Sequence, residues 1–119
     1  MAAEKSISSS SSLAFPRLIR RVADELDIEK QQLAELAHVH RNTVSRMPRS
    51  PQLQKFLRES IRVLAAATDF NGSSKKAAFW FRNQPIADFG YRTAEALVSE
   101  GRADDVLRYI EILDAGSAG

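Results

Sequence analysis

Helix stop and start signals divide the last third of the chain into segments that are each too short to fold alone. Residues 75–82 follow a helical pattern, and Pro85 blocks its extension because the residue before a proline is restricted to extended backbone. Thr93 is placed to cap a second segment that Gly101 ends, and a third segment runs to Gly116. Short helices bury little apolar area, so these segments must pack on the preceding helix or on a partner.

Apolar residues in the rest of the chain recur at three- and four-residue spacing, which predicts helices. We expect one helix from Pro16 to Leu26, a second capped by Asp27, a third over 41–47, and a long fourth starting at Ser50-Pro51. No segment shows sustained alternation of apolar and polar residues, so we expect no sheet. The predicted fold class is therefore all-α.

Two low-hydrophobicity segments indicate how the chain is organised. The Ser-rich residues 1–15 predict a disordered tail. The Asn-Gly-Ser-Ser sequence at 71–74 predicts a turn and the boundary between two parts, residues 16–70 and 74–119.

Composition excludes several classes of protein. The chain has no cysteine, which removes disulfides, cysteine nucleophiles and thiolate metal sites and fits a cytoplasmic location. It has no run of about 18 apolar residues, so we expect no membrane span. His38 and His40 lack the helical spacing of a metal pair, and the adjacent Asp104 and Asp105 face different directions on a helix. We therefore expect no metal, no cofactor and no enzymatic activity.

The net charge of +2 is small, but basic residues are concentrated in one region. Residues 41–62 contain six basic residues and one acid, whereas residues 71–119 contain six basic residues and seven acids. A local cluster of this kind suits contact with phosphates, and its alternative interpretation is a solvated helix face.

Residues 32–47 predict a helix-turn-helix. Ala34 is small enough for two helices to approach closely, and Val39 and Val44 fill the space between them. Polar side chains that suit base and phosphate contact then project from the second helix. The candidate DNA-binding residues are His40, Arg41, Asn42, Thr43, Ser45, Arg46 and Arg49.

The segment LAELAHVHRNTVSRM resembles the helix-turn-helix of the Cro/repressor-like, or Xre, class. His38 stands where that class usually has glycine, and left-handed backbone there costs a non-glycine residue on the order of 1 kcal/mol. Histidine tolerates that conformation better than most residues. The alternative is an ordinary pair of core helices.

The C-terminal part contains a series of short motifs at characteristic spacing: Trp80-Phe81, Asn83-x-Pro85, Phe89-Gly90, Thr93-Ala94, Leu97-Val98, Gly101-Arg102, Val106-Leu107, Tyr109-Ile110 and Ala115-Gly116. With these motifs it resembles the toxin-binding domain shared by Xre/MbcA/ParS-type antitoxins. Tyr91 departs from the family pattern, because the family often has glycine or another small residue there.

The resemblance implies the antitoxin of a type II toxin–antitoxin system, acting on a RES-domain toxin that degrades NAD or uses it for ADP-ribosylation. It also implies that the C-terminal domain covers the entrance of the toxin's active site. The N-terminal domain would dimerise and repress the operon's own promoter, so operator DNA is a second expected partner.

Five aromatic residues lie between positions 79 and 91, and we expect Trp80 and Phe89 to be mostly core. Two alternatives stay open. One is a dimeric transcription regulator without a toxin partner, and the other is a toxin-neutralising protein whose helix-turn-helix is only a scaffold. The candidate toxin-binding residues are Tyr91, Arg92, Arg102, Arg108, Gly116, Ser117, Ala118 and Gly119.

Overall fold

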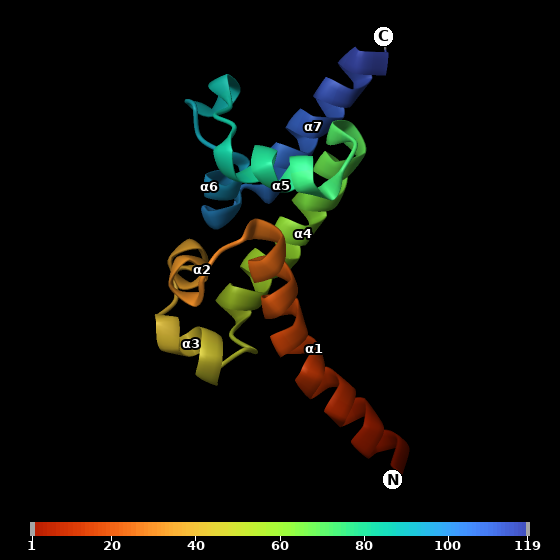
Figure 1. Cartoon of the computed structure of the whole chain (residues 1–119), viewed down its shortest axis with the longest axis vertical. Helices are drawn as coiled ribbons and strands as arrows, with labels where there is room; N and C mark the ends of the chain where they lie inside the picture. Colours follow the sequence, from red (N-terminus) through yellow and green to blue (C-terminus); the bar gives the residue numbers. More distant parts are fainter. Residues whose placement is uncertain (1, 119) are drawn as a thin grey trace. The chain divides into compact units, whose positions relative to one another are not determined.

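A computed structural model describes the backbone of residues 2–118 and the side chains of residues 14–116 (Figure 1). Within that range the chain is all-helical and contains no strand, as the sequence predicted; an isolated antiparallel bridge joins Ile86 and Arg92. No helix in this range is long and apolar enough to cross a membrane. The elements are α1 (Ala2–Leu26), α2 (Lys30–Ala37), α3 (Arg41–Arg46), α4 (Pro51–Asn71), α5 (Ser74–Asn83), the 3-10 turn η1 (Ala87–Phe89), α6 (Ala94–Ser99) and α7 (Ala103–Ala118).

The chain divides into two units, Met1–Leu57 and Arg58–Gly119, and the division falls inside α4. The turn at 71–74, which we expected to separate two domains, lies within the second unit. The apolar stripe of α4 is buried along most of the helix, from Leu53 to Ala67. A long helix can therefore supply core residues to both units, and a turn in the sequence need not mark their boundary.

The first unit contains α1, α2, α3 and the first turns of α4. Helices α2 and α3 pack against each other. Leu33 of α2 and Val44 of α3 are buried, whereas the outer faces of both helices are polar. Helix α1 begins at Ala2, so residues 2–15 are helical rather than the disordered tail that their composition suggested; Met1 lies outside the described residues. Extending an existing helix needs no new nucleus, and this helix continues through Pro16, which cannot donate the usual backbone hydrogen bond.

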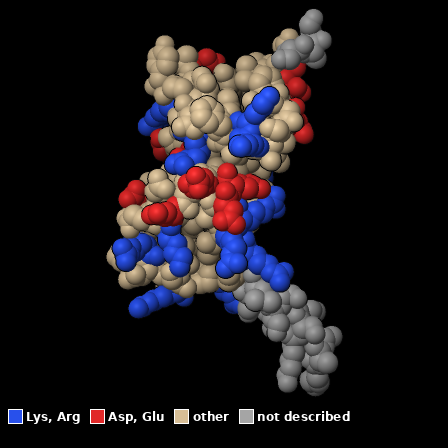
Figure 2. Space-filling view, in the orientation of Figure 1, with Lys and Arg blue, Asp and Glu red and all other residues tan. Residues whose placement is uncertain are grey.

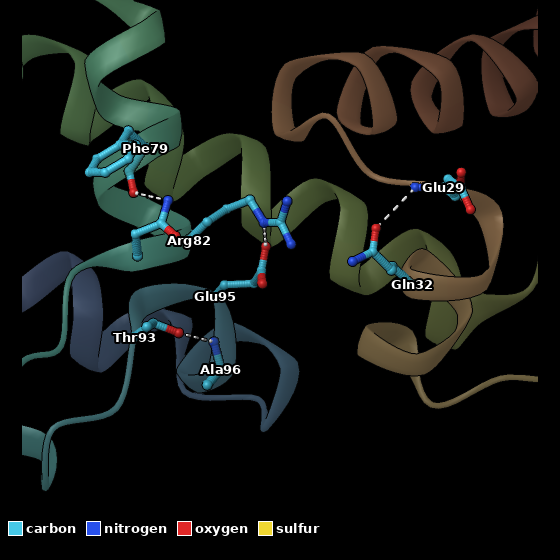
Figure 3. A network of polar contacts seen from close by, with 8 residues as sticks. Glu29, Gln32, Phe79, Arg82, Thr93, Glu95 and Ala96 are labelled. Carbon is cyan, nitrogen blue, oxygen red and sulfur yellow. Dashed lines mark hydrogen bonds and ion pairs between the residues drawn. The ribbon is translucent and has the colours of Figure 1, made fainter.

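The connection between α1 and α2 differs from the expected capping arrangement. Asp27 takes a left-handed conformation (φ 54°) after the end of α1 and is not the N-cap of α2. Glu29 occupies that position, and its backbone N–H donates to Oε1 of Gln32 at 3.3 Å (Figure 3). Aspartate is among the few residues that enter left-handed backbone readily, so it ends one helix here instead of starting the next.

The second unit contains the rest of α4 together with α5, η1, α6 and α7. The expected cap of α6 is confirmed, because Thr93 Oγ1 accepts from the Ala96 N–H at 3.1 Å. Either Ser73 or Ser74 could cap α5 from the sequence, and Ser73 does so: its Oγ accepts from the Lys76 N–H at 3.1 Å. Gly101 ends α6 with φ 84°, also as predicted. Gly116 does not end α7, because a glycine that keeps helical backbone only weakens a helix by about 1 kcal/mol.

The core of the second unit uses different aromatic positions from those expected. Phe81 is fully buried, whereas Trp80 and Phe89 are only half-buried. Ala77 and Phe81 are four residues apart and form the buried face of α5, which turns Trp80 toward the edge and leaves Phe79 exposed. The ring of Phe89 packs edge-on against the ring of Tyr109 in α7 instead of entering the core.

Candidate DNA-binding and partner-binding surfaces

A three-residue turn, 38–40, joins α2 to α3. His38 has left-handed backbone (φ 59°, ψ 42°), as its place in the sequence predicted. The N–H of His38 donates to the Glu35 carbonyl at 3.2 Å, and the N–H of Val39 donates to the Ala34 carbonyl at 3.0 Å. These bonds satisfy carbonyl groups that the end of α2 would otherwise leave unpaired, so the turn is well defined without glycine.

His40 caps α3. Its Nδ1 accepts a hydrogen bond from the Asn42 N–H at 3.1 Å, which uses one ring nitrogen inside the protein. Val44, on the opposite face of α3, is buried and holds the helix on α2. Among the candidate DNA-binding residues, His40 therefore has a structural role in addition to any contact it makes outside the chain.

The remaining candidates on α3 form one exposed face. Arg41 and Ser45 are four residues apart, as are Asn42 and Arg46, so these four side chains share one side of the helix. Thr43 is half-buried and lies off this face. Figure 2 shows Lys and Arg side chains around α3 on the face in view.

Arg49 stands apart from the face of α3. It follows the end of that helix, and its guanidinium lies 5.3 Å from the centre of the Phe15 ring of α1. This cation–π contact fastens the segment after α3 to α1. The sequence grouped Arg49 with the α3 residues, but the structure engages it elsewhere in the first unit.

Lys30, at the start of α2, is a candidate that sequence reasoning missed. Its Nζ donates to Ser45 Oγ at 3.1 Å and brings a positive charge to the α3 face. The two residues are 15 positions apart, so no local spacing could have paired them. A depression of about 470 Å³ lies here, lined by Glu29, Lys30, Gln31, Arg41, Asn42 and Ser45.

A closed loop between α5 and α6 presents Tyr91. The N–H groups of Phe89 and Tyr91 both donate to the Ile86 carbonyl, at 3.0 and 2.9 Å, and the Ile86 N–H donates to the Arg92 carbonyl at 2.9 Å. Gly90 and Tyr91 both have left-handed backbone, with φ 70° and 66°. Left-handed backbone is unfavourable for a non-glycine residue such as Tyr91. The Tyr91 side chain is 73% exposed, so little burial of the ring offsets that cost.

The other candidate partner-binding arginines differ in their surroundings. Arg92 is exposed and forms an ion pair with Glu100. Arg102 is half-buried: its Nε lies 2.9 Å from Asp105 Oδ2, and its guanidinium is 5.2 Å from the centre of the Phe89 ring. Arg102 therefore fixes the loop to α7 and is less available to a partner than the sequence suggested.

The remaining candidates lie on α7. Arg108 is exposed, and so is Gly116. The backbone of Ser117 and Ala118 continues the helix, but their side chains, and all of Gly119, lie outside the described residues. The backbone of the predicted partner-binding end is thus helical up to Ala118.

A buried ion pair connects α5 to α6 and was not visible in the sequence. Arg82 Nε lies 3.0 Å from Glu95 Oε2, and both side chains are largely shielded from solvent (Figure 3). Burial raises the pKa of the Glu95 carboxyl, and the charge and hydrogen bond of Arg82 act in the opposite direction. The pair fixes the start of α6, directly after the loop that presents Tyr91.

Comparisons with models of known protein families, with curated proteins and with solved structures found no match to this chain.

Proposed function

We propose that this protein is the antitoxin of a type II toxin–antitoxin system. It binds and blocks a RES-domain toxin that consumes NAD or uses it for ADP-ribosylation, and it represses its own promoter. The family resemblance of the sequence is the basis of the proposal. Two surfaces support it, one in each unit of the chain.

The first surface is the exposed face of α3. Arg41, Asn42 and Arg46 stand on one side of a short helix that is held on α2 by a buried valine. Arginine pairs with guanine and asparagine with adenine in the major groove, while lysine and serine suit phosphates. Lys30, bonded to Ser45, adds a positive charge beside this face. This arrangement supports binding to operator DNA.

The second surface carries the proposal, and its central observation is the exposed Tyr91 in left-handed backbone. Three backbone hydrogen bonds close the loop, and the Arg102–Phe89 contact fixes it to α7. An exposed aromatic side chain on a loop whose backbone is already fixed is the kind of residue that anchors protein interfaces, because little backbone conformational entropy is lost on binding. We assign toxin binding to this loop together with Arg92 and Arg108.

The decisive experiment is co-expression with the product of the gene adjacent to this one, followed by affinity capture and an assay of NAD consumption. We expect the two proteins to purify together and NAD consumption to be suppressed. Tyr91→Ala is expected to restore NAD consumption without unfolding the antitoxin. If the neighbour remains active in the complex, the regulator without a toxin partner becomes the better interpretation.

Operator binding is tested separately with Arg46→Ala. We expect the affinity for upstream DNA to fall by roughly 1–3 kcal/mol, with toxin binding unchanged. Arg17→Ala, which removes an exposed arginine from α1, is the charge-matched control and should have a much smaller effect. Toxin neutralisation without any DNA binding by the unaltered chain would favour the helix-turn-helix as a scaffold only.

A further inference from the structure

A basic and aromatic groove lies along α5 in the second unit, and none of its lining residues belongs to the two surfaces described above. Its volume is about 480 Å³. Phe79 at its edge is 71% exposed, although large apolar side chains are normally covered. No acidic residue contributes to it. The groove is lined by Asn71, Lys75, Lys76, Phe79, Trp80 and Gln84.

The last turns of α7 carry the complementary features. Ile112 is 64% exposed and is placed about 200° around the helix from the buried Ile110, so it does not belong to the core face. Glu111 and Asp114 flank it and are exposed. Residues 109–116 contain no basic residue. Figure 2 shows acidic side chains near this end of the chain, beside the grey C-terminal atoms.

We propose that the groove of α5 binds the end of α7 from a second copy of this chain. Ile112 would insert beside Phe79 and Trp80, where each apolar surface covers the other. Glu111 and Asp114 would face Lys75 and Lys76. Within the described residues none of these four charged groups forms an ion pair, so all are available to a second chain.

The second copy fits better than an unrelated protein because the chain itself carries both halves of the contact. An exposed basic groove and an exposed acidic, apolar helix end are each a liability for a monomer. When two copies exchange their α7 ends, both grooves are filled in one closed, two-fold assembly. Opposite charges at both contacts set the register and disfavour like-charged alternatives.

Charge reversal tests this pairing. One variant carries Lys75→Glu and Lys76→Glu, and another carries Glu111→Lys and Asp114→Lys. Each places like charges in both contacts, so we expect the assembly mass from light scattering to halve and the dissociation constant to rise at least tenfold. All four side chains are exposed, so circular dichroism and thermal unfolding should show a folded protein in both cases.

Two matched controls follow from the geometry. An equimolar mixture of the two variants has opposite charges at both contacts, so the full assembly is expected to return. A chain with all four substitutions keeps the net charge of the original and swaps the two signs, and it should also associate. Trp80 is the single tryptophan, so its fluorescence should shift on dilution of the unaltered chain and not of either reversal variant.

The assembly contact is elsewhere if both reversal variants keep the mass and dissociation constant of the unaltered chain. The proposal also fails if the mixture does not associate, or if the unaltered chain shows no dilution-dependent change in Trp80 fluorescence. None of these measurements includes DNA or another protein. Failure of the self-association proposal therefore leaves the antitoxin proposal to its own experiments.

Discussion

Replacement of Tyr91 by glycine is expected to stabilise the fold while it weakens partner binding. Left-handed backbone costs a non-glycine residue roughly 1–2 kcal/mol, and glycine removes that cost. Glycine also gives the unfolded chain more freedom, which offsets about 0.4–1 kcal/mol. Because the side chain is 73% exposed, its removal sacrifices only a small area of contact. The net expectation is a gain of about 0.5 kcal/mol in the free energy of unfolding, estimated from these two terms.

Alanine at the same position separates the backbone effect from the side-chain effect. Tyr91→Ala removes the ring and keeps the unfavourable backbone, so it should be less stable than Tyr91→Gly by about 0.5–1 kcal/mol. Phe79 provides the matched control, because it is 71% exposed but lies inside α5. There glycine should be less stable than alanine by about 1 kcal/mol, the opposite sign.

Urea unfolding of these four variants measures all the differences in one experiment. Equal stability of the glycine and alanine variants at position 91 would refute the argument from backbone strain. Both Tyr91 variants should bind the proposed toxin partner more weakly, since both lack the ring. If only the alanine variant lost binding, loop conformation rather than the tyrosine side chain would be the important feature.

Two further predictions concern the second unit. Burial raises the pKa of Glu95 in the folded chain above its ordinary 4.5, so the folded state binds more protons and this group's contribution to stability falls as pH rises through the folded pKa. Glu95→Gln removes that dependence. The free energy of unfolding of the variant minus that of the unaltered chain should therefore rise from acid to neutral pH. Urea unfolding of both proteins across this pH range measures the difference. Phe81→Ala should cost about 3–5 kcal/mol because Phe81 is fully buried, whereas Phe79→Ala should cost under about 0.5 kcal/mol in the dissociated chain; thermal unfolding at a concentration too low for self-association compares them.

Local signals in the sequence predicted most of the helix ends. A serine or threonine directly before a helical pattern can satisfy one N–H group of the first turn, and Ser73 and Thr93 do so. Gly101 and His38 take the left-handed backbone expected where a helix ends. These features depend on a few neighbouring residues and not on the rest of the chain.

The sequence did not predict which of two nearby residues caps a helix, whether a glycine ends one, or which of two neighbouring aromatic residues faces the core. Asp27 and Glu29 can both cap a helix, and the position of the first turn decides between them. Gly116 could end a helix or remain inside it. The apolar spacing of α5 did not show that Phe81, rather than Trp80, faces the core, because that depends on which elements cover the helix.

The same distinction applies to the candidate surfaces. The exposed face of α3 follows from the helical repeat and from buried Val44, so its members could be identified from the sequence. The Lys30–Ser45 and Arg82–Glu95 contacts join residues 15 and 13 positions apart on different helices. Such contacts depend on helix packing, which composition and spacing do not specify.

The boundary inside α4 also determines how the protein can be divided for experiments. Cutting between Leu57 and Arg58 would interrupt a continuous helix and leave about four carbonyl and four N–H groups without helical partners at the new ends. A shorter fragment built to isolate one activity would therefore lose part of its own scaffold. Fragments that each retain the whole of Pro51–Asn71 keep that scaffold intact, so overlapping fragments are the appropriate way to assay the two proposed binding activities separately.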